Sequence, residues 1–180
     1  VVTRETELSR TLSLLSEPPA LVVTDSQAFG IVSKTVPESV RLTSFSILFA
    51  RYKGDLRTAV LGAAALRRLK DGDTVLISEG CTHHRQCGDI GTEKLPRWVK
   101  SYTGRDVNFA FTSGGEFPDD LSPYALVIHC GACMLNEREM QSRLCRAAEQ
   151  SVPITNYGIA IAQMHGILDR ALQPFSALHA

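Results

Sequence analysis

Two short clusters of cysteine and histidine contain the residues of this chain that could bind a metal or carry out thiol chemistry. The first runs from Cys81 to His84 and the second from His129 to Cys133. Thiolate is a soft, anionic ligand that suits zinc and iron–sulfur clusters. The Cys130-x-x-Cys133 spacing lets one turn aim two sulfurs at one metal centre. Alone it is a weak signal, because structural thiols and redox pairs share it, and the distant Cys81 strengthens it.

An apolar run typical of a buried strand precedes each cluster. Residues 74–78 precede the first cluster and residues 124–128 precede the second. Parallel strands of an open α/β sheet end on one edge, where ligands bind. If these two strands are parallel, their ends bring Cys81, Cys130 and Cys133 together despite their separation in the sequence. We therefore expect one site at this edge, built from both clusters.

Ligand chemistry leaves two kinds of metal site open. One is an iron–sulfur cluster held by Cys81, Cys130 and Cys133, with the fourth iron position open or weakly ligated. The other is zinc in a Cys3His or Cys2His2 site, since tetrahedral zinc accepts either set and His83 and His129 flank the cysteines. Nearby histidine favours zinc, whereas a three-cysteine set favours a cluster with one replaceable ligand. Ligand chemistry alone does not decide between the two.

A thioredoxin-like dithiol of Cys130 and Cys133 is a third kind of site, and it fits least well. Such a motif usually opens a helix directly after its strand, whereas two further residues separate Cys133 from the expected helix cap at Asn136. The dithiol also leaves Cys81 and the histidines without a role. Of the other cysteines, Cys87 is more simply an unliganded loop thiol than a spare ligand, and Cys145 lies in a helical pattern.

Composition and motifs exclude several function classes. Lys and Arg total 19, as do Asp and Glu, so bulk charge gives no reason to expect a nucleic-acid partner. No stretch approaches the roughly 20 apolar residues of a membrane span, and the charged N-terminus does not resemble a signal peptide. The sequence contains no G-x-x-x-x-G-K-[ST] phosphate loop, no G-x-G-x-x-G fingerprint and no C-x-x-x-C-x-x-C radical-enzyme pattern. Five cysteines with no sign of secretion predict reduced thiols in a cytoplasmic protein.

The apolar pattern predicts strands and helices in alternation, which is typical of βαβ units. Strands are expected at 20–24, 42–49, 74–78, 107–111, 124–128 and 153–157. Helices are expected at 3–16, 27–34, 56–69, 136–150 and 159–172, and over a stretch that follows Gly91 and runs to Tyr102, with Pro96 near its first turn. Asp25 or Ser26 is expected to cap the second helix, and Gly158 to turn the chain before the last one. The fold class is therefore α/β, with two small domains at 1–72 and 73–180, each a mainly parallel sheet flanked by helices.

The helix expected at 56–69 has a middle that is small on nearly every side. Residues 62–65 are Gly-Ala-Ala-Ala. Small residues let a helix approach a sheet or a partner helix closely. An ordinary well-packed α/β helix is the simpler interpretation of this pattern.

Four segments together resemble the HydF family of [FeFe]-hydrogenase maturation scaffolds. They are residues 81–91, 94–98, 129–139 and 153–158, which include the C-x-H and H-C-x-x-C elements of that family's cluster motif. The resemblance covers the whole chain but not the family's N-terminal GTPase domain, and the missing initiator Met agrees with a portion of a longer protein. It implies a dimerisation domain over 1–72, a cluster-binding domain over 73–180 and no catalytic turnover in this chain.

The resemblance implies a particular cofactor and particular partners. It implies a [4Fe–4S] cluster on Cys81, Cys130 and Cys133, with an exchangeable fourth ligand. It also implies a homodimeric, cytoplasmic scaffold that carries a transient diiron precursor of the 2Fe subcluster. That precursor is built with the radical maturases HydE and HydG and passed to the apo-hydrogenase HydA. A zinc-stabilised interaction module is the alternative function, and edge-to-edge joining of strands within 20–49 is the expected mode of dimerisation.

Three residues are candidates for the fourth iron ligand. Asp89 ranks first as a weakly held oxygen donor, His129 second and His83 third. Gly88 stands where the family pattern suggests a second acid, which makes the loop less acidic. Each histidine has a simpler role as well, which is to hydrogen-bond a sulfur or a backbone carbonyl and orient the loop.

Several further residues are expected near the site or away from it. The simpler orienting role is the favoured one for His84. Asn156 and Tyr157, at the end of the last strand, are expected to support the site from the same edge. His165 and His179 are expected on the surface of helices.

Overall fold

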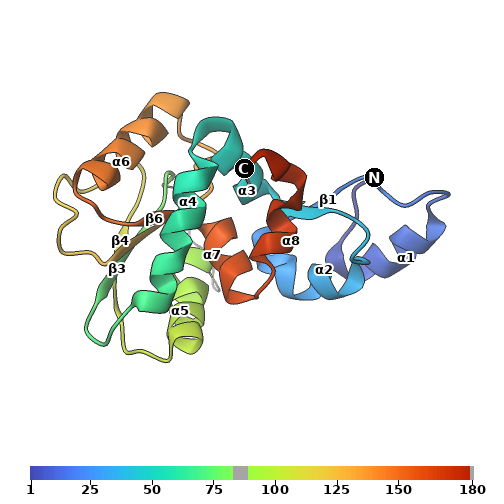
Figure 1. The fold of residues 1–180 in the computed structure, drawn as a ribbon, viewed down its shortest axis with the longest axis horizontal. Coiled ribbons are helices and arrows are strands. Elements are labelled where there is room, and N and C mark those ends of the chain that lie inside the picture. Colours follow the sequence, from blue (N-terminus) through green and yellow to red (C-terminus); the bar gives the residue numbers. More distant parts are fainter. Residues whose placement is uncertain (83–88, 179–180) are drawn as a thin grey trace.

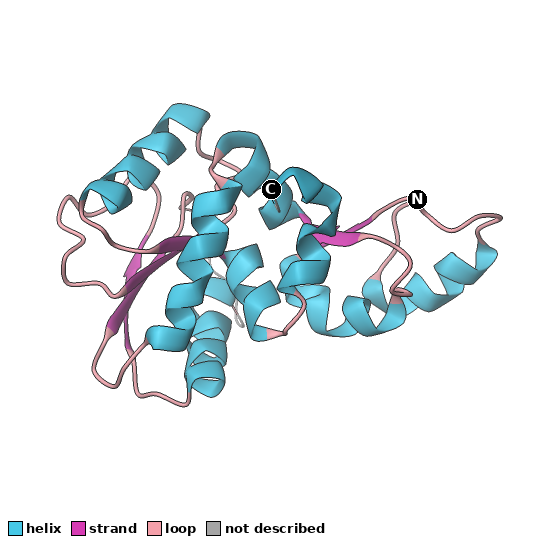
Figure 2. Ribbon diagram, in the orientation of Figure 1, coloured by secondary structure: helices cyan, strands magenta, loops and turns pink. Residues whose placement is uncertain are grey.

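The structure is a computed structural model that describes residues 1–82 and 89–178. It contains two parallel sheets flanked by helices, which confirms the α/β class (Figure 1 and Figure 2). The larger sheet lies at one end of the molecule and the smaller one towards the other end, near the N-terminus (Figure 2). No helix among the described residues is both long and apolar enough to cross a membrane.

The larger sheet has four parallel strands in the order β4-β3-β5-β6. Its strands begin and end within two residues of the sequence-based expectation; they are β3 (Thr74–Ser78), β4 (Asn108–Thr112), β5 (Leu126–His129) and β6 (Ile154–Asn156). The chain passes from β3 to β4 on one side and then returns to place β5 on the other side of β3. This reversal creates a switch point between the carboxyl ends of β3 and β5, where open α/β sheets bind ligands.

Helices cover both faces of this sheet. One face carries α6 (Glu137–Glu149), and the other carries α4 (Leu56–Ala63), α5 (Leu95–Thr103) and α7 (Tyr157–Met164) (Figure 1). Successive side chains of a strand point to opposite faces of the sheet. Both faces are apolar because helices cover both of them. The paired row Leu76, Val127 and Ile154 belongs to the core beneath α6. Ile77 and Ile128, one residue further along, belong to the larger core on the other face.

Gly62 lets α4 lie directly on the backbone of β6. A Cβ atom at this position would overlap the carbonyl group of Ile154. The expectation that the small residues of this helix permit a close approach is confirmed, and the partner is the sheet. A short 3-10 segment, η3 (Ala64–Arg68), continues α4. A π-helical turn, η4 (Ile90–Lys94), leads into α5.

The smaller sheet is a parallel pair, β1 (Val22–Thr24) and β2 (Leu42–Ser44). Short helices surround it: η1 (Glu5–Glu7), α1 (Leu8–Leu14), η2 (Ser26–Ala28), α2 (Phe29–Thr35) and α3 (Phe45–Lys53). Asp25 caps η2, because its Oδ1 accepts from the Gln27 N–H at 2.8 Å. The predicted cap is therefore confirmed, and with it the helix that follows.

At the ends of β2 and β6 the sequence-based expectation is wrong. The stretch 42–49 is a strand only as far as Ser44, whose Oγ accepts from the Ile47 N–H at 3.4 Å and so begins α3. Gly158 does not turn the chain, because Asn156 caps α7 by accepting from the Ile159 N–H at 2.9 Å. In both places a polar residue at the strand end starts a helix at once.

The C-terminal segment is also divided where one helix was expected. Gly166, with φ +70, separates α7 from α8 (Leu168–Leu172), and η5 (Gln173–Leu178) follows. Arg170 on α8 donates to the carbonyl oxygens of Ser33 and Val36, both at 2.8 Å. The N-terminal third and the rest of the chain thus share contacts and one core, and the division at 72 stays a prediction.

Candidate metal-binding site

Cys81 and Cys130 follow neighbouring parallel strands, β3 and β5, at the switch point of the sheet. The Cys130 N–H donates to the Ser78 carbonyl at 2.8 Å, so the ladder between the strands continues into the second cluster. The Gly114 N–H, from the loop after β4, donates to the Cys81 carbonyl at 3.3 Å. Three strand ends therefore position the two loops that carry the thiols.

The Cys130 sulfur is partly buried and receives two backbone donors. The N–H groups of Gly80 and Ala132 lie 3.1 and 3.4 Å from its Sγ. Burial raises the pKa of the Cys130 thiol, the two N–H groups lower it, and the neighbouring Cys81 and Cys133 thiols raise it. Burial and the neighbouring thiols thus favour the neutral thiol of Cys130, whereas the two backbone donors favour its thiolate.

A residue with a left-handed backbone conformation lies in the loop between Cys130 and Cys133. Ala132 has φ 55, which is uncommon for a residue with a Cβ, and its side chain is 4% exposed. This conformation belongs to the turn whose N–H reaches the Cys130 sulfur. The loop is therefore shaped around that sulfur.

Lys53 of α3 holds the same loop from the other side. Its Nζ donates to the carbonyl oxygens of Cys133 and Leu135 at 3.1 and 2.7 Å. The ammonium also lies 5.1 Å from the centroid of the Phe49 ring. Lys53 is not predictable as a site residue from the sequence, because nothing in the local pattern links a helix-end lysine to a loop 80 residues later.

His129 is fully buried and has a partner on each ring nitrogen. Its Nε2 lies 3.0 Å from Arg143 Nη1, and its Nδ1 lies 2.8 Å from the Cys130 carbonyl oxygen. Arginine can only donate, so Nε2 accepts and Nδ1 carries the proton that is donated to the carbonyl. Burial, followed by the Arg143 charge, lowers the pKa of His129 to about 4. The imidazole is therefore neutral near pH 7.

His129 and Cys130 direct their side chains to opposite faces of the sheet. His129 pairs with Ser78, two residues after the row that packs beneath α6, and its ring lies near Phe117 of that core. Cys130 packs against the core on the other face. The geometry matches the simpler histidine role, hydrogen bonding to a backbone carbonyl. Metal ligation by His129 would require one of its two ring contacts to break.

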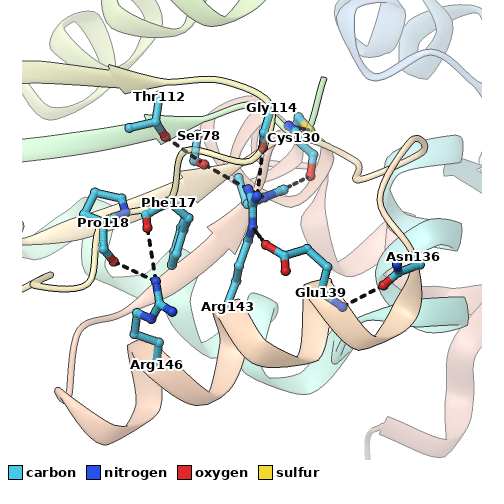
Figure 3. A network of polar contacts seen from close by, with 12 residues as sticks. Ser78, Thr112, Gly114, Phe117, Pro118, Cys130, Asn136, Glu139, Arg143 and Arg146 are labelled. Atoms are coloured by element: carbon cyan, nitrogen blue, oxygen red, sulfur yellow. Dashed lines mark hydrogen bonds and ion pairs between the residues drawn. The ribbon is translucent and has the colours of Figure 1, made fainter. Parts of the chain in front are cut away.

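Arg143 of α6 lies at the centre of a polar network behind the cysteine loops (Figure 3). Its side chain is 1% exposed. Nε donates to Glu139 at 2.8 Å, and Nη2 donates to the Gly114 carbonyl at 2.8 Å. The guanidinium carbon lies 5.0 Å from the Phe117 ring centroid. The burial of Arg143 is not predictable from the sequence, because a Glu and an Arg four residues apart on a helix usually form a surface pair.

Asp89, the first candidate for the fourth ligand, caps η4. Its Oδ2 accepts from the Thr92 N–H at 2.8 Å and from the Thr92 hydroxyl at 2.9 Å. A second carboxylate, Glu79, is 6% exposed and accepts from the Tyr157 hydroxyl at 3.3 Å. Glu79 was also missed, although it directly follows β3 and precedes Cys81 by two residues.

Tyr157 shows that these acids and a thiol share one neighbourhood. Burial raises the pKa of its phenol above the usual value, and Glu79, Cys130 and Asp89 raise it further. Tyr157 thus lies at the expected edge. Asn156 instead links helices, since its Nδ2 donates to the Ser46 carbonyl at 2.8 Å in addition to capping α7.

The structure does not describe four of the sequence-predicted residues. His83, His84, Cys87 and His179 are outside the described residues. His165 is exposed at the end of α7, as expected, with its ring 6.4 Å from that of Trp98. Within 1–82 and 89–178, no group of three or more His, Cys, Asp or Glu residues is arranged so that it could hold a metal ion.

Comparison with protein families gives two matches that together span most of the chain. Residues 1–54 match the model of the hydrogen maturase F dimerization domain, and residues 57–174 match that of the hydrogen maturase F tetramerization domain. Asp55 lies between the two matched ranges and caps α4 by accepting from the Thr58 N–H at 2.9 Å. A search of curated proteins finds no match.

Proposed function

The chain belongs to the hydrogen maturase F family of hydrogenase maturation proteins, and we propose that it is a scaffold that binds a [4Fe–4S] cluster through Cys81, Cys130 and Cys133. One observation carries the proposal. Cys81 and Cys130 follow the neighbouring parallel strands β3 and β5, Cys133 comes three residues after Cys130, and two backbone N–H groups donate to the Cys130 sulfur. Cysteine thiolates are the usual ligands of iron–sulfur clusters, and hydrogen bonds to sulfur tune them.

Three thiolates fit a cluster that keeps one iron position exchangeable. A bound cluster would supply that iron as an attachment point for a further ligand. Asp89 remains the first candidate for a labile fourth donor, and Glu79 joins it because both acids lie near Tyr157. His129 becomes less suitable because both of its ring nitrogens are engaged.

The scaffold would carry a diiron precursor between other proteins. We propose that the radical maturases HydE and HydG build this cargo and that apo-hydrogenase HydA receives it. This chain needs no catalytic residue for that role, because it only binds the precursor, holds it and releases it to the hydrogenase.

Self-association is part of the proposal, since the names of both matching domains describe it. Within the described residues β1 and β2 pair only with each other. Each therefore has an outer edge that could add a strand from a second copy. Of the range 20–49 that was expected to supply the joining strands, only β1 and β2 can do so, because residues 45–53 form a helix.

Anaerobic reconstitution with ferrous iron and sulfide tests cluster binding. The proposal predicts a brown protein with broad absorption near about 400 nm. Serine at Cys81, Cys130 or Cys133 should abolish that absorption, and Cys145→Ser is the control because Cys145 is exposed on α6. A colourless protein that binds stoichiometric zinc would instead support the interaction module and reject the cluster.

A further inference from the structure

We infer that Arg143 is a positioning residue that sets the spacing of Cys81 and Cys130, because one guanidinium reaches the backbone carbonyl of each through a single intermediate. This inference rests on the proposed function, since it concerns the same site. We call these two chains of hydrogen bonds the Cys130 arm and the Cys81 arm. The Cys130 arm connects Arg143 Nη1 to the Cys130 carbonyl through the His129 ring. The Cys81 arm connects Arg143 Nη2 to the Cys81 carbonyl through the backbone of Gly114.

The Cys130 arm follows from the donor chemistry of arginine. Arg143 Nη1 donates to His129 Nε2 at 3.0 Å, which leaves the ring proton on Nδ1. That proton is donated to the Cys130 carbonyl at 2.8 Å. The carbonyl of Cys130 is thus fixed from the α6 face, while its sulfur receives N–H groups on the other face.

The Cys81 arm uses both polar groups of one glycine. Gly114 accepts from Arg143 Nη2 at 2.8 Å through its carbonyl and donates its N–H to the Cys81 carbonyl at 3.3 Å. Gly114 has φ +62, and a Cβ there would press on the Thr82 side chain. The glycine therefore suits a loop that must approach the first cysteine closely.

The burial of Arg143 argues against a role limited to its own helix. A buried charge is costly unless it is paired and hydrogen-bonded. Glu139 supplies the countercharge at 2.8 Å on the same helix, but the other contacts reach residues after β4 and at the ends of β3 and β5, where Nη1 also donates to the Ser78 hydroxyl at 3.5 Å (Figure 3). Arg146, one turn further along α6, binds the Phe117 and Pro118 carbonyls and does not contact His129 or Gly114.

The first experiment needs no cluster and uses the intact chain. Proton–nitrogen NMR of protein with ¹⁵N-labelled histidine should show an Nδ1–H signal for His129, identified by its absence in His129→Asn. That signal and the exchange protection of the Gly114 amide should both fall in Arg143→Met and persist in Arg146→Met. An Nε2–H tautomer in the wild-type protein would overturn the inference. Wild-type values of both quantities in Arg143→Met would do the same.

The second experiment measures the cluster directly. Groups that orient metal ligands typically contribute about 10–100-fold to metal affinity. Arg143→Met should weaken iron retention by about that factor and alter the electron paramagnetic resonance spectrum of the reduced cluster, whereas Arg146→Met should match the wild type. An unchanged spectrum and retention in Arg143→Met would contradict the inference.

Substitutions of His129 test the Cys130 arm separately from the Cys81 arm. They also keep the inference testable if Arg143→Met does not fold. His129→Leu cuts only the Cys130 arm, so iron retention should fall while Gly114 protection stays. His129→Asn, whose amide can donate near the former Nδ1, should retain the wild-type spectrum, and loss of the cluster in this variant would contradict the Cys130 arm. If the wild-type protein takes up no cluster, the proposed function fails, and the histidine and Gly114 measurements still decide the role of Arg143.

Discussion

The Nζ of Lys53 donates to the carbonyl oxygen of Cys133 at 3.1 Å, across 80 residues of sequence. Lys53 lies within the part of the chain that matches the dimerization domain, and Cys133 lies within the part that matches the tetramerization domain. A shift of α3 therefore reaches the cysteine loop directly. Lys53 is thus a direct contact between the two matched parts of the chain, as are Gln141 with the Gly54 carbonyl and Asn156 with the Ser46 carbonyl.

Substitution of Lys53 tests this link. Lys53→Met removes two hydrogen bonds from the loop, and we expect a loss of about 1–2 kcal/mol in the free energy of unfolding, measured with urea. Alkylation of Cys133 should also become faster. Arg51→Met is the control, because Arg51 is exposed on the same helix. Equal alkylation rates in both variants would show that Lys53 does not hold the loop.

The close contact of α4 with β6 predicts a large effect from one methyl group. Gly62→Ala would place a Cβ against the Ile154 carbonyl and force the helix away from the sheet. Overpacking of this kind typically costs about 1–3 kcal/mol, even though alanine favours helix. Thermal unfolding should show a clear drop for Gly62→Ala and almost none for Ala64→Ser, which is exposed on η3. A rise in stability for Gly62→Ala would refute the contact.

Asparagine at Asp89 separates capping from ligation. Asparagine caps helices as well as aspartate does, so Asp89→Asn should leave stability within about 0.5 kcal/mol. If Asp89 is the fourth ligand, the spectrum of the reconstituted cluster should change in this variant and not in Glu79→Gln. The reverse result would assign the position to Glu79. Identical spectra in the wild type and both variants would exclude both carboxylates.

Tyr157 should stabilise the acidic side of the site. Tyr157→Phe removes the hydroxyl that donates to Glu79 at 3.3 Å. We expect a loss of about 1 kcal/mol, the usual net contribution of one hydrogen bond, as measured by urea unfolding. Tyr52→Phe is the matched control, since Tyr52 is 81% exposed. A larger effect at Tyr52 than at Tyr157 would be inconsistent with the buried pair.

The sequence alone predicts the part of this structure that follows from local patterns and from one rule of sheet topology. The Asn136 cap is an example: its Oδ1 accepts from the Glu139 N–H at 2.8 Å where the spacing indicated. The parallel pairing of β3 with β5, the strands that precede Cys81 and Cys130, is another. Residues 45–49 were misassigned because an apolar, aromatic run fits a strand and a buried helix equally well.

The groups that hold the site in place could not be predicted in this way. Arg143 and Lys53 act across space on residues from other strands and loops, and no spacing rule in one sequence records such a contact. Glu79 differs, because its position before Cys81 was visible, but nothing in the sequence showed that it would be buried against Tyr157.

The 49 positions from Cys81 to Cys130 also have a consequence for the newborn chain. Ribosomes add roughly 5–20 residues per second, so Cys130 is synthesised roughly 2–10 seconds after Cys81. β4 emerges within that interval and can pair with β3, but the strand that brings Cys130 does not yet exist. Throughout this time Cys87 is the only other cysteine in the growing chain. The three proposed cluster ligands are all present only after Cys133 has been added, so a cluster on these three thiols would have to be acquired after that point.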